Sequence, residues 1–292
     1  MSETNVQRNY KDTVFRMLFR EKENLLSLYN ALNATTYTDV DRLEITTLEN
    51  AVYLNYKNDI SFVFDFELLL YEHQSTFNPN MPLRDLFYVT GILQGRTKDK
   101  NLYSNSIVRI PAPKFVVFYN GTDFQPEQQI LKLSNAFEKK QEQPALDLTV
   151  TVYNINLGHN QELLDACQLL KEYAQYVEQV RTFAKEMPFS EAVGKAVDYC
   201  IMNGILSDFL SKNRAEAIAM SIFEYDEEKH IQSEREEWRE IGREEGRTEG
   251  RDALALMLKS LMDAGKTEEL QRALSDSKYR EQLYREYCLK EK

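Results

Sequence analysis

Three consecutive polar residues end a segment that otherwise has the sequence of a buried strand. In ELLLYEHQ, the three leucines at 68–70 and Tyr71 are followed by Glu72, His73 and Gln74. Carboxylate, imidazole and amide groups can bind metal ions, protons or phosphate oxygens, and burying them without partners costs free energy. The chemistry available to these groups therefore depends on the residues that face them.

The preceding segment supplies a facing carboxylate. DISFVF is separated from ELLLYEHQ by only two residues, which predicts a β-hairpin with Asp65 and Phe66 at its turn. Pairing outward from this turn places Asp59 opposite Glu72, and opposed side chains in an antiparallel pair have Cβ atoms about 4.5–5.5 Å apart. Asp-Phe is not a favoured two-residue turn, and a slip of one residue would separate the two acids.

The predicted register also gives the two acids their neighbours. Gln74 shares the face of Glu72, Lys57 lies opposite Gln74, and His73 points to the other face. Two carboxylates this close repel, and a divalent cation would compensate, because Mg²⁺ is held by one or two carboxylates and keeps positions for water and phosphate oxygens. Mn²⁺ and Ca²⁺ are alternatives. The other interpretation is a solvated strand end in which Lys57 relieves the repulsion between Asp59 and Glu72.

The charge of the chain is concentrated in one segment. The 292 residues carry a net charge of −11, which is unfavourable for binding nucleic acid. Residues 224–252 contain 12 acids and 6 bases, a net of −6, so the rest of the chain carries only the remaining −5. The overall charge therefore neither supports nor excludes DNA as a partner.

Export and membrane insertion are not predicted. The amino terminus, MSETNVQRNYKDT, lacks the apolar run of a signal peptide. Apolar runs such as FVVFY fall far short of the about 20 residues that a membrane span needs. Cys167, Cys200 and Cys288 are too few and too scattered for a disulfide framework or a zinc site. We therefore expect a cytoplasmic protein without a membrane partner.

Hydrophobic periodicity predicts an α/β part followed by an all-helical part. The predicted strands are 52–56, 59–64, 67–74, 111–119 and 146–156. The predicted helices are 12–32, 81–94 with Pro82 in its first turn, 161–184 behind the cap Asn160, one capped by Ser190, and long polar helices to the carboxyl terminus. This predicts a domain at 1–165, a helical extension packed on or beside it at 166–223, and a charged helical tail at 224–292.

Several segments resemble a known family. KNDISF, LLLYEHQS, NMPLRDLFY, APKFVVFYNG and VYNINLGHN, in this order, resemble the Rpn family of recombination-promoting nucleases, also described as putative transposases. ILSDFLSKNRAEAIAMSIFEYDEE and IGREEGRTEGR extend the resemblance over nearly the whole chain. The resemblance implies an α/β, restriction-endonuclease-like PD-(D/E)XK core, a mixed sheet flanked by helices, followed by an all-helical carboxyl-terminal region. The implied function is a Mg²⁺-dependent DNA endonuclease, linked to recombination or to mobile or phage DNA.

The resemblance also implies roles for individual residues. Asp59 takes the place of the motif aspartate and Glu72 that of the second acid, so both are implied as metal ligands. Gln74 falls where the motif usually has lysine, and a neutral amide can only form hydrogen bonds. Lys57, on the same face, is our candidate for the displaced cation.

Two further positions extend the implied site. The superfamily often adds a glutamate from the first helix, and Glu23 and Glu21 both lie on the flanks of that helix's apolar stripe. Either could instead be a solvated helix charge. Arg84, just after Pro82, is a candidate to contact a phosphate or to steady Glu72, although a surface arginine is an equal alternative.

The tail has a regular pattern and a second hypothesis attached to it. Arginines recur every four residues from 235 to 251, and glycines at 242, 246 and 250 keep the same step. Helix-surface ion pairs should stabilise this helix by about 0.2–0.5 kcal/mol each, and each glycine should destabilise it by about 1 kcal/mol. The helix should therefore be only marginally stable on its own. We expect it to pair with a second copy or a protein partner, unless it is simply a solvated helix. The alternative function is accordingly a catalytically weak nuclease-fold protein that acts as an interaction or regulatory module through this tail.

Overall fold

The computed structural model describes residues 14–46, 59–222, 243, 250 and 254–288. It separates into two compact units, Met1–Glu228 and Lys229–Lys292. The strand predicted at 52–56 lies outside the described residues. So does the arginine and glycine series of the tail, apart from Arg243 and Gly250.

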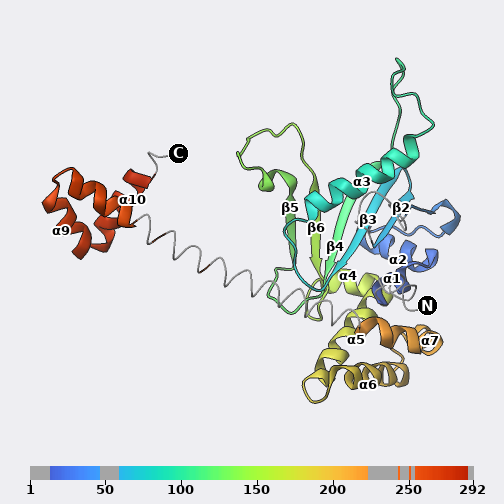
Figure 1. Cartoon of the computed structure of the whole chain (residues 1–292). Helices are drawn as coiled ribbons and strands as arrows, with labels where there is room; N and C mark the ends of the chain where they lie inside the picture. The colour runs from blue at the N-terminus through green and yellow to red at the C-terminus, as the bar shows by residue number, and fades with distance from the viewer. Residues whose placement is uncertain (1–13, 47–58, 223–242, 244–249, 251–253, 289–292) are drawn as a thin grey trace, which may run out of the picture. The chain divides into compact units, whose positions relative to one another are not determined.

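A six-stranded mixed sheet forms the centre of the described part of the first unit (Figure 1). Its order is β1-β2-β3-β4-β6-β5, in which β3, β4 and β6 are parallel and the other neighbours are antiparallel. The prediction of an α/β fold with a mixed sheet is therefore confirmed. The strands are β1 (Glu44–Ile45), β2 (Ile60–Phe64), β3 (Glu67–Gln74), β4 (Ala112–Tyr119), β5 (Gln128–Lys132) and β6 (Thr149–Asn154).

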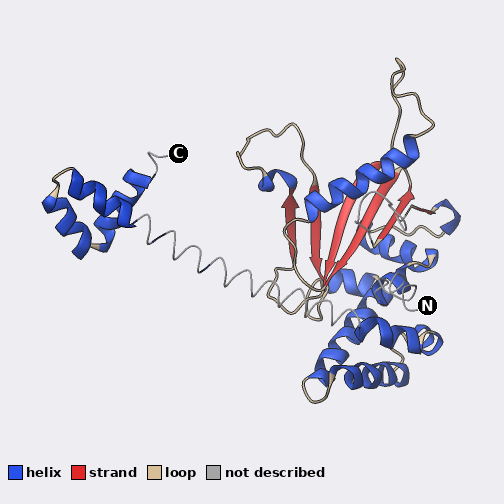
Figure 2. Cartoon of the chain, viewed as in Figure 1, coloured by secondary structure: helices blue, strands red, loops and turns tan. Residues whose placement is uncertain are grey.

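The hairpin of β2 and β3 has the predicted register. Phe64 pairs with Glu67 next to the turn, and Ile60 pairs with Tyr71 at the far end. Every residue of β3 after Glu67 is buried, because the strand lies between β2 and β4 with helices on both faces of the sheet (Figure 2). The polar residues at its end are therefore enclosed.

Side-chain contacts compensate for the unfavourable turn sequence. Asp65 and Phe66 have φ angles of 48° and 65°, the left-handed pair that a two-residue turn needs to match the twist of its strands. The Asp65 carboxylate accepts hydrogen bonds from the Tyr37 hydroxyl at 3.2 Å and from Arg42 Nη2 at 2.7 Å. These two bonds fix a turn that the residue types alone would not favour.

Helices cover both faces of the sheet. One face packs against α3 (Met81–Thr97). The other packs against α1, α2, α4 and α5, with α6 and α7 packed beyond α5 (Figure 1). The bounds of these helices are α1 Val14–Phe19, α2 Lys22–Asn33, α4 Gln161–Ala166, α5 Gln168–Ala184, α6 Phe189–Met202 and α7 Ser207–Lys212, with 3₁₀ turns at Val40–Arg42 and Leu133–Ala136.

Strand β3 contributes to both hydrophobic cores. Leu68 and Leu70 belong to the core on the α3 face, whereas Leu69 and Tyr71 belong to the core on the α5 face. By the same alternation Glu72 and Gln74 face α3, and His73 faces α5. The predicted separation of Glu72 from His73 is confirmed by their contacts, which are described below.

The helical segment after β6 is built into the core of the sheet. Leu170 and Tyr173 of α5 lie in one buried cluster with Phe118 of β4. Ala217 and Met220 belong to the same cluster, and residues 214–222 are helical. The first unit thus depends on residues well beyond the last strand.

Two predicted helices are each divided into two. Residues 12–32 do not form one helix: α1 ends at Phe19 and α2 begins at Lys22, and the Asn24 amide donates to the Leu18 carbonyl at 2.7 Å across the break. Such local side-chain bonds compete with helical ones. Cys167 has an extended conformation and separates α4 from α5.

Two predicted helix caps are not formed, and two strands of the sheet were not predicted. Asn160 precedes α4, but its side chain makes no capping bond. Ser190 lies inside α6, whose cap position is Pro188. Strands β1 and β5 were not predicted, because β1 has only two residues and β5 is a half-exposed edge strand without a run of apolar residues.

The second unit has a small core of its own. Residues 254–263 are helical, and α9 (Thr267–Ser275) and α10 (Ser277–Cys288) follow them. Met257, Leu261, Ala273 and Leu283 form its buried cluster. Among the described residues of the whole chain, no helix has the length and apolar character required to cross a bilayer.

Candidate active site

The two acids singled out in the sequence lie together at the end of the hairpin. Glu72 Oε1 accepts a hydrogen bond from the backbone N–H of Asp59 at 3.0 Å. In return, Asp59 Oδ2 accepts from the backbone N–H of His73 at 2.8 Å. Each carboxylate is thus held by the backbone of the opposite chain segment, just past the last paired residues of the hairpin. The structure brings Asp59 and Glu72 together as the register requires.

Helix α3 adds a cation to this pair. Arg84 Nη2 lies 3.6 Å from Glu72 Oε2, and Glu72 itself is only 3% exposed. The Arg84 guanidinium also donates to the Tyr88 hydroxyl, at 3.2 Å from Nε and 2.9 Å from Nη2. Because Tyr88 lies one turn further along the helix, it fixes the direction of the arginine side chain. Of the two roles suggested for Arg84, steadying Glu72 agrees directly with this contact.

A third carboxyl group lies close by and was not singled out in the sequence. Asp85 is 1% exposed, and its Oδ1 has no hydrogen-bond partner among the described residues. Burial raises the pKa of Asp85 to about 7, with the Arg84 charge opposing the rise. One signal was available: Asp85 lies four residues after Met81 and three before Tyr88, on the buried stripe of α3.

The electrostatics of Glu72 reflect this crowding. Its pKa is held well above the usual range of a glutamate, first by burial and then by the negative charges of Asp59 and Asp85. The Arg84 charge and the hydrogen bond from the Asp59 N–H act in the opposite direction. The net effect of these groups favours the protonated form of Glu72 more than in an exposed glutamate.

This donor set fits one type of metal site. The described residues contain no group of three or more His, Cys, Asp or Glu side chains arranged to hold a metal ion. Mg²⁺, however, is commonly held by one or two carboxylates, with water and substrate oxygens in its other positions. Asp59 and Glu72 meet that requirement. A cation beside them would offset the negative charges that contribute to the raised pKa of Glu72.

The three other predicted catalytic residues, Gln74, Lys57 and Glu23, have different outcomes. Gln74, the last residue of β3, is buried on the face of Glu72. Lys57 lies outside the described residues. Glu23 is an exposed residue in the first turn of α2, and this helix packs on the opposite face of the sheet from Glu72. The structure thus places Gln74 on the same face of the sheet as Glu72, and it does not bring Glu23 to the pair of acids.

On the other face, His73 is an interior residue. Its Nε2 lies 3.0 Å from the Tyr173 hydroxyl, and its ring stacks on Phe15 with centroids 5.0 Å apart. Burial lowers the pKa of His73 to about 3, so the ring is neutral near pH 7. His73 is thus a hydrogen-bonded residue of the interior. The Tyr173 hydroxyl also accepts from Asn120 Nδ2 at 3.4 Å, so α5 is tied to the ends of both β3 and β4.

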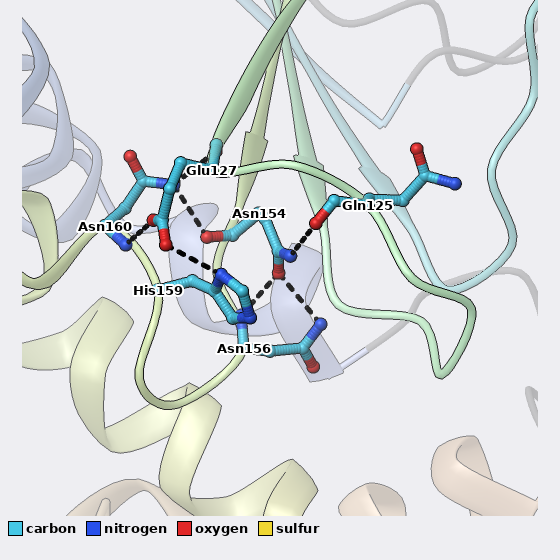
Figure 3. A network of polar contacts seen from close by, with 6 residues as sticks. All are labelled: Gln125, Glu127, Asn154, Asn156, His159 and Asn160. Carbon is cyan, nitrogen blue, oxygen red and sulfur yellow. Dashed lines mark hydrogen bonds and ion pairs between the residues drawn. The ribbon is translucent and has the colours of Figure 1, made fainter.

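A second set of bonds fixes the end of β6 (Figure 3). Asn154 donates to the Gln125 carbonyl at 3.0 Å, and Asn160 donates to the Asn154 carbonyl at 2.8 Å. His159 lies in this loop, with Nδ1 2.9 Å from Glu127 Oε1. These side chains satisfy one another, so we assign the network to holding the loops. It also explains why Asn160 makes no helix cap.

Arg181 joins this network to the rest of the strand ends. Its guanidinium donates to Asn156 Oδ1 at 2.8 Å and to the carbonyl of Asn120. Asn156 in turn donates to the Gly121 carbonyl at 3.0 Å. The carboxyl ends of β3, β4 and β6 are therefore each connected to α5 by side-chain hydrogen bonds.

Comparison of the chain with known protein families, with curated proteins and with solved structures found no match. The function proposed below consequently depends on the geometry of Asp59, Glu72 and their neighbours, together with the sequence resemblance described above.

Proposed function

We propose that this chain is a Mg²⁺-dependent DNA endonuclease that hydrolyses phosphodiester bonds. The observation that carries the proposal is the pair Asp59 and Glu72, in which each carboxylate accepts a backbone N–H from the other segment and Glu72 is buried beside Arg84. Two carboxylates held close together repel each other, and a shared metal ion would offset that repulsion. The resemblance to the Rpn family adds the expectation of recombination, or of mobile or phage DNA as substrate.

In this proposal Asp59 and Glu72 hold the cation, which when bound would neutralise charge on the phosphodiester and lower the pKa of an attacking water. The reciprocal backbone bonds fix both carboxylates before substrate arrives. Arg84 keeps Glu72 oriented, and Tyr88 keeps Arg84 from swinging away. Gln74, on the same face, can orient a water by hydrogen bonding but carries no charge.

Cleavage of supercoiled plasmid tests the proposal. The full chain should convert it to nicked circles with Mg²⁺ and not with excess EDTA. Asp59→Ala should abolish this conversion while circular dichroism and melting show an intact fold. A matched control is Asp208→Ala, because Asp208 is an exposed residue of α7. Nicking by a verified Asp59→Ala preparation at the rate of the unaltered chain would contradict the assignment.

A second candidate function has one observation in its favour. The carboxyl-terminal unit, Lys229–Lys292, is compact and has its own buried cluster. A separate small unit suits an interaction or regulatory module attached to a catalytically weak nuclease fold. Absence of Mg²⁺-dependent nicking, together with capture of a defined partner by residues 229–292, would favour this alternative.

A further inference from the structure

The connection between α3 and β4 is an exposed loop with an unusual composition. Residues 98–111 leave the end of α3, project from the body of the first unit and return to β4 (Figure 1). Leu102, Tyr103 and Ile107 in this loop are 65%, 99% and 86% exposed. Large apolar side chains gathered on a projecting segment mark an interaction site more often than isolated exposed ones do.

The loop is also positively charged. Lys98, Lys100 and Arg109 are exposed, and Asp99 is the acid among residues 98–111. The loop therefore has a net charge of +2, whereas the net charge of the whole chain is −11. Within the described part of the chain, none of these three cations forms an ion pair. The neighbouring cations differ: Arg96 pairs with Glu44 at 2.7 Å, and Lys114 with Glu67 at 2.6 Å. The loop cations are therefore available to an external anion.

Its polar residues give the loop a defined shape. The Tyr103 N–H donates to Asn101 Oδ1 at 3.0 Å, and the Ser106 N–H donates to Ser104 Oγ at 3.1 Å. At the base, the Ala112 N–H donates to the Phe66 carbonyl at 2.9 Å. The exposed side chains are thus presented from a turn-rich segment, and less ordering is required when a partner binds.

We infer that the loop 98–111 anchors the backbone of duplex DNA, with Lys98, Lys100 and Arg109 at phosphates and Tyr103 and Ile107 in the minor groove. This inference deepens the proposed function and takes its partner, DNA, from it. Lysine and arginine neutralise phosphates, and apolar side chains inserted in the minor groove are a recurring device of DNA-binding proteins. Insertion in a bilayer fits less well, because asparagine and serine side chains alternate with the apolar ones and would be desolvated there.

The fold separates this anchor from the candidate active site by a fixed length. Helix α3 has 17 residues, so at about 1.5 Å per residue it is about 25 Å long, from the turn that carries Arg84 to the start of the loop. At 3.4 Å per base pair, this length corresponds to about seven base pairs of duplex. The loop would therefore contact DNA at least about seven base pairs from the cleaved bond.

Binding of a fluorescently labelled duplex, measured by anisotropy over a salt series without divalent metal, tests the inference. The triple variant Lys98→Gln, Lys100→Gln, Arg109→Gln should bind at least about tenfold more weakly at low salt, and its log–log salt slope should fall by about two to three. Tyr103→Ala should lose about tenfold in affinity with an unchanged slope. The charge-matched control is Lys185→Gln, Lys195→Gln, Lys212→Gln in the helical segment, which should stay within about twofold of the unaltered chain.

The outcomes separate this inference from the proposed function. If the unaltered chain binds duplex and the loop variants weaken binding, but no preparation nicks plasmid with Mg²⁺, the anchor stands and the endonuclease proposal fails. If nicking requires Asp59 but the triple variant of the loop binds duplex DNA as well as the control triple variant does, only the inferred role of the loop is overturned. It is also overturned if the unaltered chain binds no duplex, or if the loop substitutions weaken sedimentation with phosphatidylglycerol vesicles and leave DNA binding unchanged.

Discussion

At the scale of single residues, the site is a balance between repulsion and reciprocal bonding. Asp59 and Glu72 each accept a backbone N–H from the other segment, whereas their negative charges, with that of Asp85, raise the pKa of Glu72. The metal-free protein therefore carries an electrostatic cost that a divalent cation would remove. Such a cost is typical of functional sites, where stability is given up for chemistry.

The pH dependence of stability should report this cost. The folded-state pKa of Asp85 is raised from 3.8 to about 7, so its stabilising contribution is complete below pH 4 and is lost as the pH rises toward 7. About three pKa units correspond to at most about 4 kcal/mol, and Glu72 shifts in the same direction. Between pH 4 and pH 7 the melting temperature of the metal-free protein should fall less for Asp85→Asn than for the unaltered chain. Asp99→Asn is the exposed control and should behave like the unaltered chain. Equal falls in melting temperature for Asp85→Asn and the unaltered chain would contradict the raised pKa of Asp85.

Gln74 and Lys57 provide a separate prediction about the missing motif lysine. If Lys57 supplies the displaced cation, Lys57→Ala should lose most Mg²⁺-dependent nicking, and adding Gln74→Lys to it should restore part of the loss. Arg84→Gln is the informative comparison, because Arg84 is the cation that the structure places beside Glu72. Full activity of Lys57→Ala would assign the cation role to another group.

At the scale of elements, the hairpin was predictable and its surroundings were not. The two strands are almost contiguous in sequence, so the turn and the opposition of Asp59 to Glu72 followed from counting residues. The left-handed conformation of Asp65 and Phe66 depends on Tyr37 and Arg42, which no local rule connects to the turn. Asp85 was missed for a similar reason: an aspartate on a helix is usually solvated, and its burial depends on where α3 packs.

Helix α5 is the element that fixes the strand ends, and its contribution is measurable. Tyr173→Phe removes the hydroxyl that bonds both His73 and Asn120, and with it two buried hydrogen bonds. We expect a loss of about 1–3 kcal/mol in the free energy of unfolding by urea. Tyr199→Phe, at a partly exposed position in α6, should change it by less than about 0.5 kcal/mol. Equal effects would mean that the Tyr173 hydroxyl contributes little to stability.

At the scale of the whole molecule, the chain combines two compact units. The first continues past the sheet to Glu228, because Ala217 and Met220 lie in its core and the Tyr176 hydroxyl lies 2.7 Å from Ser221 Oγ. The sequence predicted this α/β core, the helical segment and the charged tail. It could not show that the helical segment completes the core, since that depends on contacts between residues far apart in the chain.

Truncation tests this arrangement. A chain ending at Glu228 should stay soluble, keep any metal-dependent nicking, and form a smaller oligomer in light scattering if the tail pairs. A chain ending at Asn213 should be clearly less stable, because it lacks Ala217 and Met220. Equal melting temperatures for the two truncated chains would contradict the placement of residues 214–222 in the core.

The central claim, that Asp59 and Glu72 act together on one metal ion, is tested most directly by comparing single and double variants. The effects of substituting groups that act as a unit are strongly non-additive. Once either carboxylate has been removed, removing the other should lower the nicking rate little further. Plasmid nicking at saturating Mg²⁺ should fall at least about a thousandfold in Asp59→Ala and in Glu72→Ala, and the double variant should be no slower than either. Losses that multiply in the double variant, or a single variant that keeps the rate of the unaltered chain, would contradict a shared metal site.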